Sequence, residues 1–318
     1  MPHILLAHPR GFCAGVDRAI NIVKQVLAYL GAPLYVLHEI VHNRAVVSEL
    51  QAQGVLFVEN MHEVPVGSTL IFSAHGIAPT IRAQAATRQL RTFDATCPLV
   101  TKVHLEIAYY SRIAHECLLI GHAAHPEIVG SLGYYDNATG GIYLIEDAQA
   151  AKTIMVKNPA ALGYVTQTTL SVDDTNHIIS ILRERFPDIK SPRKDDICYA
   201  TQNRQEAVKR LAQKSDLVLI VGSQNSSNSN RLKEVAIRAG KPAYLIDSAE
   251  EIEPTWLENA SCIGLSAGAS APESLVQTII THLQELDIGP VTKLTGPVEE
   301  VYFALPPSLR GQQEPLYS

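Results

Sequence analysis

Three cysteines in this sequence share the same local setting. Cys13, Cys97 and Cys198 each stand where an extended segment meets the expected start of a helix. A helix N-terminus presents unpaired N–H groups and about half a positive charge, which together stabilise a thiolate. Since thiolates bind metals, the three positions predict a metal centre. Cys117 and Cys262 instead begin apolar, strand-like segments, so we expect them to be buried core thiols.

Two kinds of metal centre fit three thiolates. Structural zinc sites take four protein ligands, typically from pairs of cysteines two residues apart, and the sequence has no such pair. An iron-sulfur cubane that only transfers electrons takes four cysteines, so three would leave one iron open to substrate. The pattern favours a cluster with an open iron. Zinc, or a plain structural role for the thiols, stays open at this point.

A second group of candidates lies in polar segments that follow apolar, strand-like runs. His42, His75 and His125 each have small or polar neighbours, and residues 222–230 are almost all small residues with hydrogen-bonding side chains. Hydroxyls, amides and the N–H groups of a helix start can hold a phosphate or diphosphate. The sequence therefore predicts an anion site in these loops, built without a Walker or Rossmann glycine pattern.

Two further candidates have equally good structural explanations. Glu127 stands two residues after His125, which would let both side chains reach one cavity, but it could also be a surface residue after Pro126. Ser270 lies in a polar segment, yet it stands three residues before Glu273, which is the spacing of a capping box.

Size and charge limit the class of protein. The 318 residues are 46% hydrophobic and 18% charged, with a formal net charge of -6, which predicts a globular chain with a sizeable core. An acidic chain gives no overall field that attracts nucleic acid or an anionic membrane, so we expect a small-molecule partner. The sequence shows no leader-like segment and no apolar run long enough to cross a bilayer, so we expect a cytoplasmic protein.

Short apolar segments alternate with amphipathic stretches along the chain. The residues around 201–211 place Ala207, Val208 and Leu211 on one helical face. We expect buried strands within 3–8, 34–39, 55–59, 70–75, 92–96, 117–122, 142–146, 162–167, 217–223, 243–247 and 262–268. This alternation predicts an α/β fold of mostly parallel sheets, with ligands beyond the carboxyl ends of the strands.

The spacing of the three cysteines predicts three lobes of similar size, each donating one thiol to a shared centre. The expected lobes are 14–96, 97–193 and 194–282, the last joined by the N-terminal strand in 1–13, with a tail over 283–318.

Nine segments of the sequence resemble the motifs of the 4-hydroxy-3-methylbut-2-enyl diphosphate reductase family, which catalyses the last step of the methylerythritol phosphate route to isoprenoids. The resemblance runs in order from about residue 3 to 282. The segments are RGFCAGVDRAI, HEIVHNR, FSAHG, FDATCPLVTKVH, IGHAAHPE, TQTTLSVDDT, DICYATQNRQEAV, GSQNSSNSNRL and SAGASAP.

This resemblance implies a trefoil-like arrangement of three α/β lobes around a central cavity and one 4Fe-4S cluster with an open iron. It implies that Cys13, Cys97 and Cys198 are the cluster ligands. It also implies that Glu127 delivers protons, with Thr168 relaying them. The residues implied to bind the substrate and its diphosphate are His42, His75, His125, Thr168, Ser226, Ser227, Asn228 and Ser270.

In this family, a two-electron, two-proton reduction removes the substrate hydroxyl as water and gives isopentenyl and dimethylallyl diphosphate. The resemblance implies a flavodoxin or a ferredoxin as electron donor and no nucleic-acid or membrane partner. A hydratase of the aconitase kind is the first rival, but its carboxylate substrates would call for arginines where these loops have His, Ser and Asn. An iron-sulfur sensor that binds nucleic acid is the second rival, and the acidic composition disfavours it.

Overall fold

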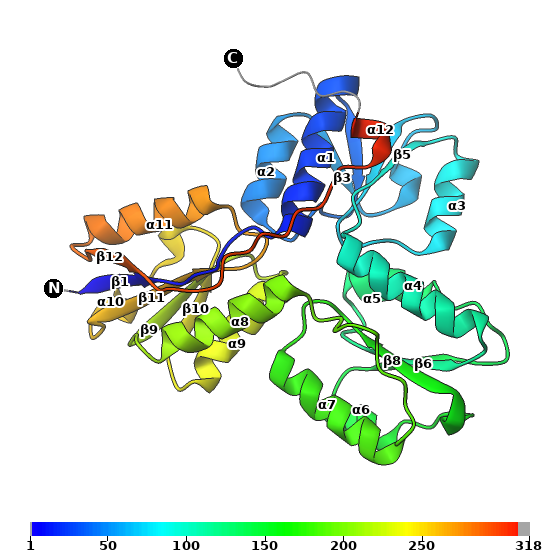
Figure 1. Cartoon of the computed structure of the whole chain (residues 1–318). Helices are drawn as coiled ribbons and strands as arrows, with labels where there is room; N and C mark the ends of the chain where they lie inside the picture. The colour runs from blue at the N-terminus through cyan, green and yellow to red at the C-terminus, as the bar shows by residue number, and fades with distance from the viewer. Residues whose placement is uncertain (1, 311–318) are drawn as a thin grey trace. The chain divides into compact units, whose positions relative to one another are not determined.

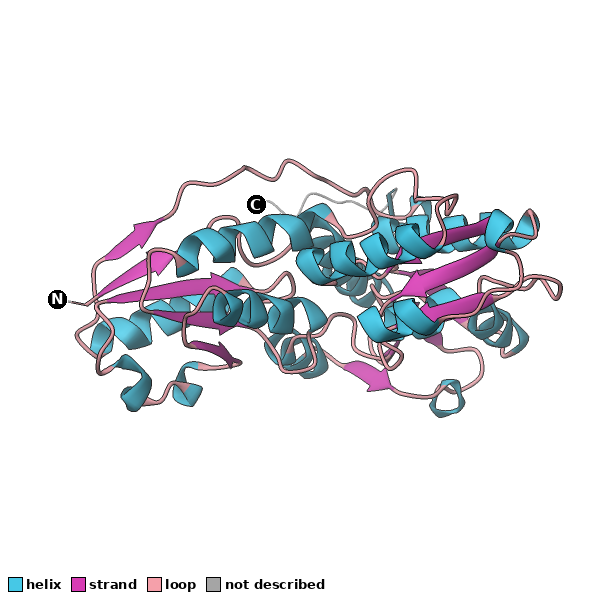
Figure 2. Ribbon diagram, turned by 90° about the horizontal axis from the view of Figure 1, so that it is seen from below, coloured by secondary structure: helices cyan, strands magenta, loops and turns pink. Residues whose placement is uncertain are grey.

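The computed structural model describes residues 2–310, and its strands form three parallel sheets (Figure 1, Figure 2). Every pairing between named strands in this part of the chain is parallel. Parallel neighbours need long crossover connections, which here are mostly helices. The expected α/β fold with three sheet-centred lobes is therefore confirmed, while the residue boundaries predicted for the lobes stay a prediction.

The contacts divide the chain into two compact units. The first unit contains Met1–Val16, His42–Glu49 and Cys198–Val301, and the second contains Asp17–Val41, Leu50–Ile197 and the chain from Tyr302 onward. None of the helices within residues 2–310 has the length and apolarity needed to cross a membrane.

The first unit is built on sheet A. Its strands lie in the order β10 (Ala243–Ile246), β9 (Leu217–Val221), β11 (Cys262–Ala267), β1 (His3–Leu6) and β12 (Val291–Lys293). Its helical elements are α8 (Tyr199–Ala212), α9 (Ser227–Arg238), η3 (Ala249–Glu251), α10 (Pro254–Leu257) and α11 (Glu273–Glu285). The edge strand β12 lies in the expected tail, where no strand was predicted, because three residues with two exposed side chains show no apolar run.

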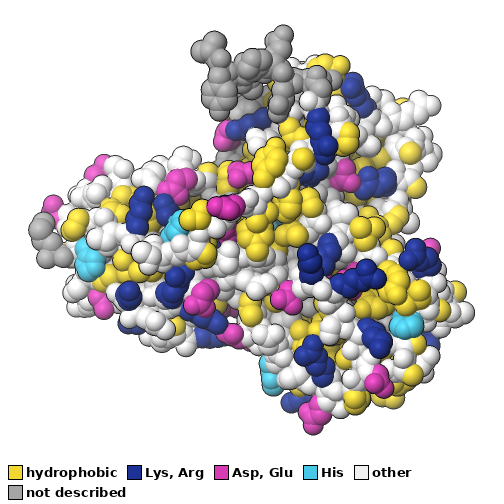
Figure 3. All heavy atoms as spheres, in the orientation of Figure 1, with side chains coloured by type: hydrophobic (Ala, Val, Ile, Leu, Met, Phe, Trp, Pro, Cys, Tyr) yellow, Lys and Arg dark blue, Asp and Glu magenta, His cyan; other side chains and the backbone are white. Residues whose placement is uncertain are grey.

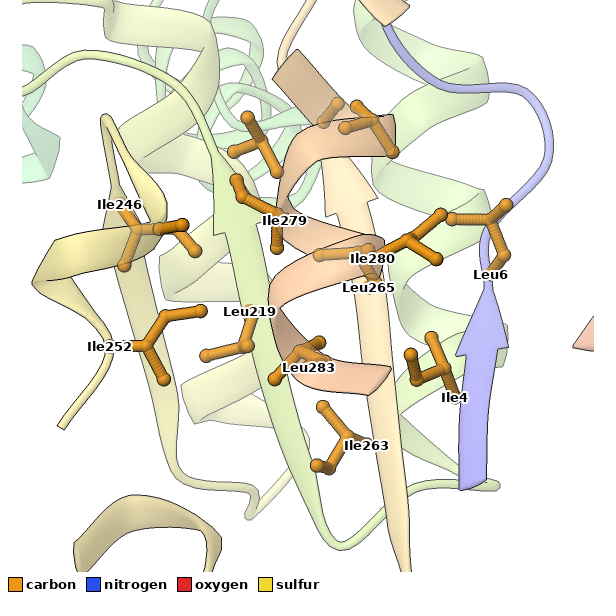
Figure 4. Packing of buried hydrophobic residues seen from close by; sticks show 14 of the residues in the cluster. Ile4, Leu6, Leu219, Ile246, Ile252, Ile263, Leu265, Ile279, Ile280 and Leu283 are labelled. Carbon is orange, nitrogen blue, oxygen red and sulfur yellow. The ribbon is translucent and has the colours of Figure 1, made fainter. Parts of the chain in front are cut away.

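Both faces of sheet A are buried, which explains the continuous apolar runs in its strands. Figure 4 shows Ile279, Ile280 and Leu283 of α11 packed over strand residues such as Leu219 and Leu265. The opposite face packs on α8 and α9 through residues that include Ala207, Val208 and Leu211. The predicted apolar face of the helix near residue 201 is thus confirmed.

The second unit holds sheets B and C. Sheet B has the order β3 (Val55–Val58), β2 (Leu34–Leu37), β4 (Thr69–Phe72) and β5 (Arg91–Asp94), and sheet C has β7 (Ile142–Ile145), β6 (Glu116–Ile120) and β8 (Leu162–Thr166). Its helical elements are η1 (Met61–Glu63), α3 (Pro79–Thr87), α4 (Pro98–Arg112), α5 (Pro126–Leu132), α6 (Ala148–Thr153), η2 (Pro159–Ala161), α7 (Val172–Arg185) and α12 (Pro307–Arg310). The helices α1 (Ala14–Leu30) and α2 (Arg44–Ala52) each have residues in both units. Each of the eleven predicted strand segments contains a strand.

A buried arginine fixes the loop before α1 within the first unit. Arg204 of α8 is fully buried, and its guanidinium donates to the carbonyl oxygens of Gly11 (2.7 and 2.9 Å) and Phe12 (3.0 Å). It also pairs with Glu299, whose two carboxylate oxygens lie 3.0 and 3.2 Å from Nη1. A buried charge is tolerated only when it is paired and hydrogen-bonded. Arg204 therefore ties the Cys13 loop, α8 and the segment after β12 together.

We expect Arg204→Met to lower the free energy of unfolding by about 3 kcal/mol, because it leaves Glu299 without its positive partner and several carbonyl oxygens without a donor. The matched control is Arg210→Met on the same helix, where a half-buried guanidinium donates to Thr295 O (2.9 Å). We expect the control to lose less than about 1 kcal/mol. Urea unfolding of the cofactor-free chains measures both, and equal losses would contradict the anchoring role.

Candidate functional site

Two of the three predicted ligand cysteines lie in one region of the first unit. Cys198 is the N-cap of α8, and its Sγ accepts a hydrogen bond from the Thr201 amide (3.4 Å) and lies 3.2 Å from Thr201 Oγ1. Cys13 directly precedes α1. The Ala14 amide donates to the Tyr199 hydroxyl (3.2 Å), so the chain neighbours of the two cysteines are in contact.

The protonation of Cys13 differs from the simple expectation of a stabilised thiolate. Burial raises the pKa of this thiol above its ordinary value, and the opposing effects of the Arg204 charge and the Gly15 and Val16 amides do not offset it. Burial removes more hydration free energy from the thiolate than the hydrogen bonds of the two helix-start amides restore, so the neutral thiol is favoured. A metal ion that binds Cys13 would therefore have to displace the proton of its thiol.

The third predicted ligand lies in the second unit. Cys97 is the N-cap of α4, and its amide donates to Ala74 O (3.0 Å) in the loop after β4. None of the five cysteines forms a disulfide, and the three predicted ligands are half-buried. Cys117 and Cys262 are buried in the core, as predicted.

The first unit gathers five of the predicted anion-binding residues around the start of α9. Ser226 is the buried N-cap of α9, Ser227 is its first residue, and Asn228 is buried in its first turn. Ser270 Oγ donates to His42 O (2.8 Å), which joins the loop after β11 to the loop after β2. The start of α9 thus offers hydroxyl, amide and N–H donors, which suit a phosphate.

These polar loops also adjoin the cysteines of the same unit. The Ala269 amide donates to Asn228 Oδ1 (2.9 Å), while Asn228 Nδ2 donates to Thr201 Oγ1 (3.4 Å). Thr201 in turn contacts the sulfur of Cys198. The alternative role of Ser270 as a helix cap is wrong, because Pro272 is the N-cap of α11 and the hydroxyl of Ser270 bonds elsewhere.

Two predicted histidines lie next to each other in the second unit. The rings of His75 and His125 meet edge to face, with centroids 5.8 Å apart. His125 is the N-cap of α5, and its Nδ1 accepts a hydrogen bond from the Glu127 amide (3.2 Å). A neutral ring that accepts at Nδ1 carries its proton on Nε2, so His125 presents a donor on its other side.

Glu127, in the first turn of α5, and Thr168, two residues after β8, form a buried pair. Glu127 is 2% exposed, and its Oε1 accepts from the Thr168 amide (2.7 Å) while Oε2 lies 2.8 Å from Thr168 Oγ1. Burial raises the pKa of Glu127 to about 7, and the carboxylate of Asp196 adds to this while both Thr168 bonds act against it. The surface alternative for Glu127 is therefore wrong, and the carboxyl can hold or release a proton near neutral pH.

Sequence reasoning missed residues that position these side chains. Thr201 is the third residue of α8 after the Cys198 cap, and this capping spacing was a usable signal. Arg204 occupies the same helical stripe as Ala200, Ala207 and Leu211, which marks it as a core-facing charge. Nothing in the sequence pattern marked Gln167. It is fully buried, and its Oε1 accepts a hydrogen bond from the His122 amide (3.1 Å).

Comparisons with known proteins agree with the predicted resemblance. The family model described as LytB protein matches residues 4–284. A 4-hydroxy-3-methylbut-2-enyl diphosphate reductase from Klebsiella pneumoniae is 58% identical over 307 residues, covering 96% of this chain and 97% of the relative. A protein of the same name from Hahella chejuensis is 58% identical over 308 residues, with the same coverage.

Solved structures agree as well. The structure of the E-1-hydroxy-2-methyl-but-2-enyl-4-diphosphate reductase from Plasmodium falciparum matches with a TM-score of 0.91 and 36% identity, covering 97% of this chain and 96% of that one. A structure of (E)-4-hydroxy-3-methyl-but-2-enyl diphosphate reductase, the terminal enzyme of the non-mevalonate pathway, matches with a TM-score of 0.63 and 33% identity. On the family match and these identities over nearly the whole chain, this chain belongs to the LytB protein family.

Proposed function

We propose that this chain is a reductase that converts 4-hydroxy-3-methylbut-2-enyl diphosphate to isopentenyl and dimethylallyl diphosphate, the last step of the methylerythritol phosphate route. Two electrons and two protons enter, the C–O bond breaks, a C–H bond forms and the hydroxyl leaves as water. Relatives of that name that are 58% identical over 96% of the chain support the assignment. The observation that carries it is the buried Glu127–Thr168 pair, because the reaction needs a proton donor near neutral pH.

The donor set fits a 4Fe-4S cluster. Cys13, Cys97 and Cys198 form no disulfide, are half-buried and each stand at the start of a helix, whereas the other two cysteines are core residues. Within residues 2–310, no three His, Cys, Asp or Glu residues are grouped to hold one metal ion. A cubane takes each cysteine at a separate iron, so it does not need such a group. When bound through three cysteines, the cluster supplies electrons and one iron that acts as a Lewis acid.

We infer that hydroxyl, amide, imidazole and backbone N–H groups bind the diphosphate. Ser226, Ser227, Asn228 and Ser270 provide hydroxyl and amide groups, and the start of α9 provides backbone N–H groups. His42 contributes from the same unit, and its Nδ1 lies 3.5 Å from Asn225 Nδ2. His75 and His125 contribute from the second unit. Hydroxyl and amide groups bind an anion without a buried countercharge, provided that each donates a hydrogen bond.

Glu127 and Thr168 move the proton. Thr168 Oγ1 donates to Glu127 Oε2 (2.8 Å) when the carboxyl is ionised. When Glu127 is protonated, its carboxyl donates instead, and the Thr168 hydroxyl can pass on its own proton. Glu127 is buried and its carboxyl is hydrogen-bonded to Thr168, so we expect its proton to pass through the Thr168 hydroxyl. The Thr168 amide stays on Oε1 in both protonation states and holds the carboxyl in place. The expected cytoplasmic location stays a prediction.

Removing a ligand thiol should remove iron. We expect Cys13→Ala, Cys97→Ala and Cys198→Ala each to lower the iron and acid-labile sulfide of anaerobically purified protein to less than about a tenth of the wild-type content. Cys117→Ala and Cys262→Ala are the matched controls and should keep both. Elemental analysis measures the iron content, and an acid-labile sulfide assay measures the sulfide content. Stoichiometric zinc without sulfide in the wild type would contradict the cluster.

Glu127→Gln should stop turnover while leaving substrate binding and iron content intact. The amide keeps the size of the side chain but carries no acidic proton, so we expect kcat to fall by about 10² to 10⁴. Because the donor is the protonated form, wild-type kcat should fall as pH rises through about 7, and this decline should be absent in the residual rate of the variant.

The control is Glu116→Gln, at the amino end of β6 in the same sheet. Glu116 is also 2% exposed, but hydrogen bonds from Tyr143 and Asn158 lower its pKa, so it is not a proton donor at neutral pH. It should keep kcat within a few fold. Near-normal turnover of Glu127→Gln would remove Glu127 from the mechanism, and loss of iron from it would assign the residue a structural role.

A further inference from the structure

A groove of about 680 Å³ runs along the outer side of α4 in the second unit. Residues along α4, from Pro98 to Ile113, form one wall, and His115 and residues 190–193 complete the lining. None of the side chains given a role in the proposed function lines this groove. It is therefore a separate feature of the surface.

The helix α4 is apolar on its solvent side as well as on its core side. Leu105, Tyr109 and Ile113 are spaced four residues apart, so they form one stripe on the helix. Their exposed fractions are 65%, 40% and 37%, while Val103 and Ile107 pack into the core from the other side. A contiguous exposed apolar stripe is typical of a protein interaction site.

Positive charge surrounds this stripe. Lys102, Arg112, Lys190 and Arg193 line the groove, together with one carboxylate, Glu106. Lys102 is paired with the buried Asp196 (3.0 Å), so the positive charge offered to a partner is mainly that of the other three. The guanidinium groups of Arg112 and Arg193 lie 5.6 and 6.0 Å from the centre of the Tyr109 ring. Figure 3 shows dark blue side chains gathered among yellow ones over α4. Such a concentration of cations stands out in a chain whose net charge is -6.

The groove also reaches a proposed cluster ligand. Cys97 is the N-cap of α4, and the next residue, Pro98, lines the groove. The reaction consumes two electrons, and the sequence has no glycine-rich motif for a nicotinamide or flavin dinucleotide that could supply them. Electrons must then come from outside the chain. A carrier bound at the start of α4 would lie close to Cys97.

We propose that the groove along α4 docks a small acidic protein that delivers electrons to the enzyme. The inference rests on the proposed function, which requires an external reductant. Charge complementarity selects the partner, because the rim of Arg112, Lys190 and Arg193 attracts an acidic surface. The stripe of Leu105, Tyr109 and Ile113 provides the apolar centre of the contact. Steering by charge speeds the encounter, and the small apolar centre lets the carrier leave again after each transfer.

The test compares two sources of electrons for the loaded enzyme. Turnover is measured with reduced methyl viologen, and with a reduced flavodoxin and a reduced ferredoxin that each have a net negative charge. The groove variant is Lys190→Glu with Arg193→Glu, and both residues are exposed. The matched control, Lys152→Glu with Lys214→Glu, makes the same change of net charge at exposed residues outside the groove.

We expect the groove variant to raise KM for the protein carrier at least tenfold at low salt while its turnover with viologen stays that of the wild type. The control should keep both values. Leu105→Gln, which removes exposed apolar surface without a charge, should also weaken carrier binding in calorimetry severalfold. Salt should raise the wild-type KM and have little effect on that of the groove variant.

Three results would overturn the proposal. The first is an equal KM for the carrier in the groove variant and the control. The second is a wild type that turns over with viologen but accepts electrons from neither carrier. Both leave the proposed function standing. A wild type that reduces the substrate with neither viologen nor a carrier would contradict the proposed function itself, and the docking proposal would fall with it.

Discussion

Parallel pairing of the strands determines where the chemistry of this chain can be. Since neighbouring strands run in the same direction, every loop that leaves the carboxyl end of a strand lies at the same edge of its sheet. His75 and Cys97 follow two paired strands of sheet B, and His125 and Thr168 follow two paired strands of sheet C. In sheet A, the loops after β9 and β11 hold Ser226 and Ser270. Residues far apart in sequence are thus brought together by the direction of the strands.

Two of the buried charged groups within residues 2–310, Arg204 and Glu127, are accommodated in opposite ways. Arg204 is paired with Glu299 and surrounded by carbonyl oxygens, so it can remain charged, and it positions backbone. Glu127 is hydrogen-bonded to Thr168, a neutral residue, and the charge that acts on it is the carboxylate of Asp196. A buried carboxyl in such surroundings is driven toward its neutral form. The first arrangement stabilises the fold, and the second stores a proton that can be used.

Much of this architecture could be predicted from the sequence, because buried parallel strands are continuous apolar runs and helix starts have recognisable capping residues. The eleven predicted strand segments and the settings of Cys97 and Cys198 followed from such local patterns. The burial of Glu127 did not, since it depends on the packing of α5 against the loop after β8. Ser270 shows the limit of a local pattern: its spacing fits a cap, but the proline two residues later begins the helix differently.

The most direct test of the account is the origin of the new C–H hydrogen. The anaerobic enzyme is incubated with 4-hydroxy-3-methylbut-2-enyl diphosphate and a chemical reductant in D₂O, and the deuterium content of the products is measured by mass spectrometry. Reductive removal of the hydroxyl with proton delivery through Glu127 and Thr168 predicts one deuterium in each molecule of isopentenyl and dimethylallyl diphosphate. A product formed without reductant, or products without solvent deuterium, would contradict the central claim that this chain is a reductase that protonates carbon.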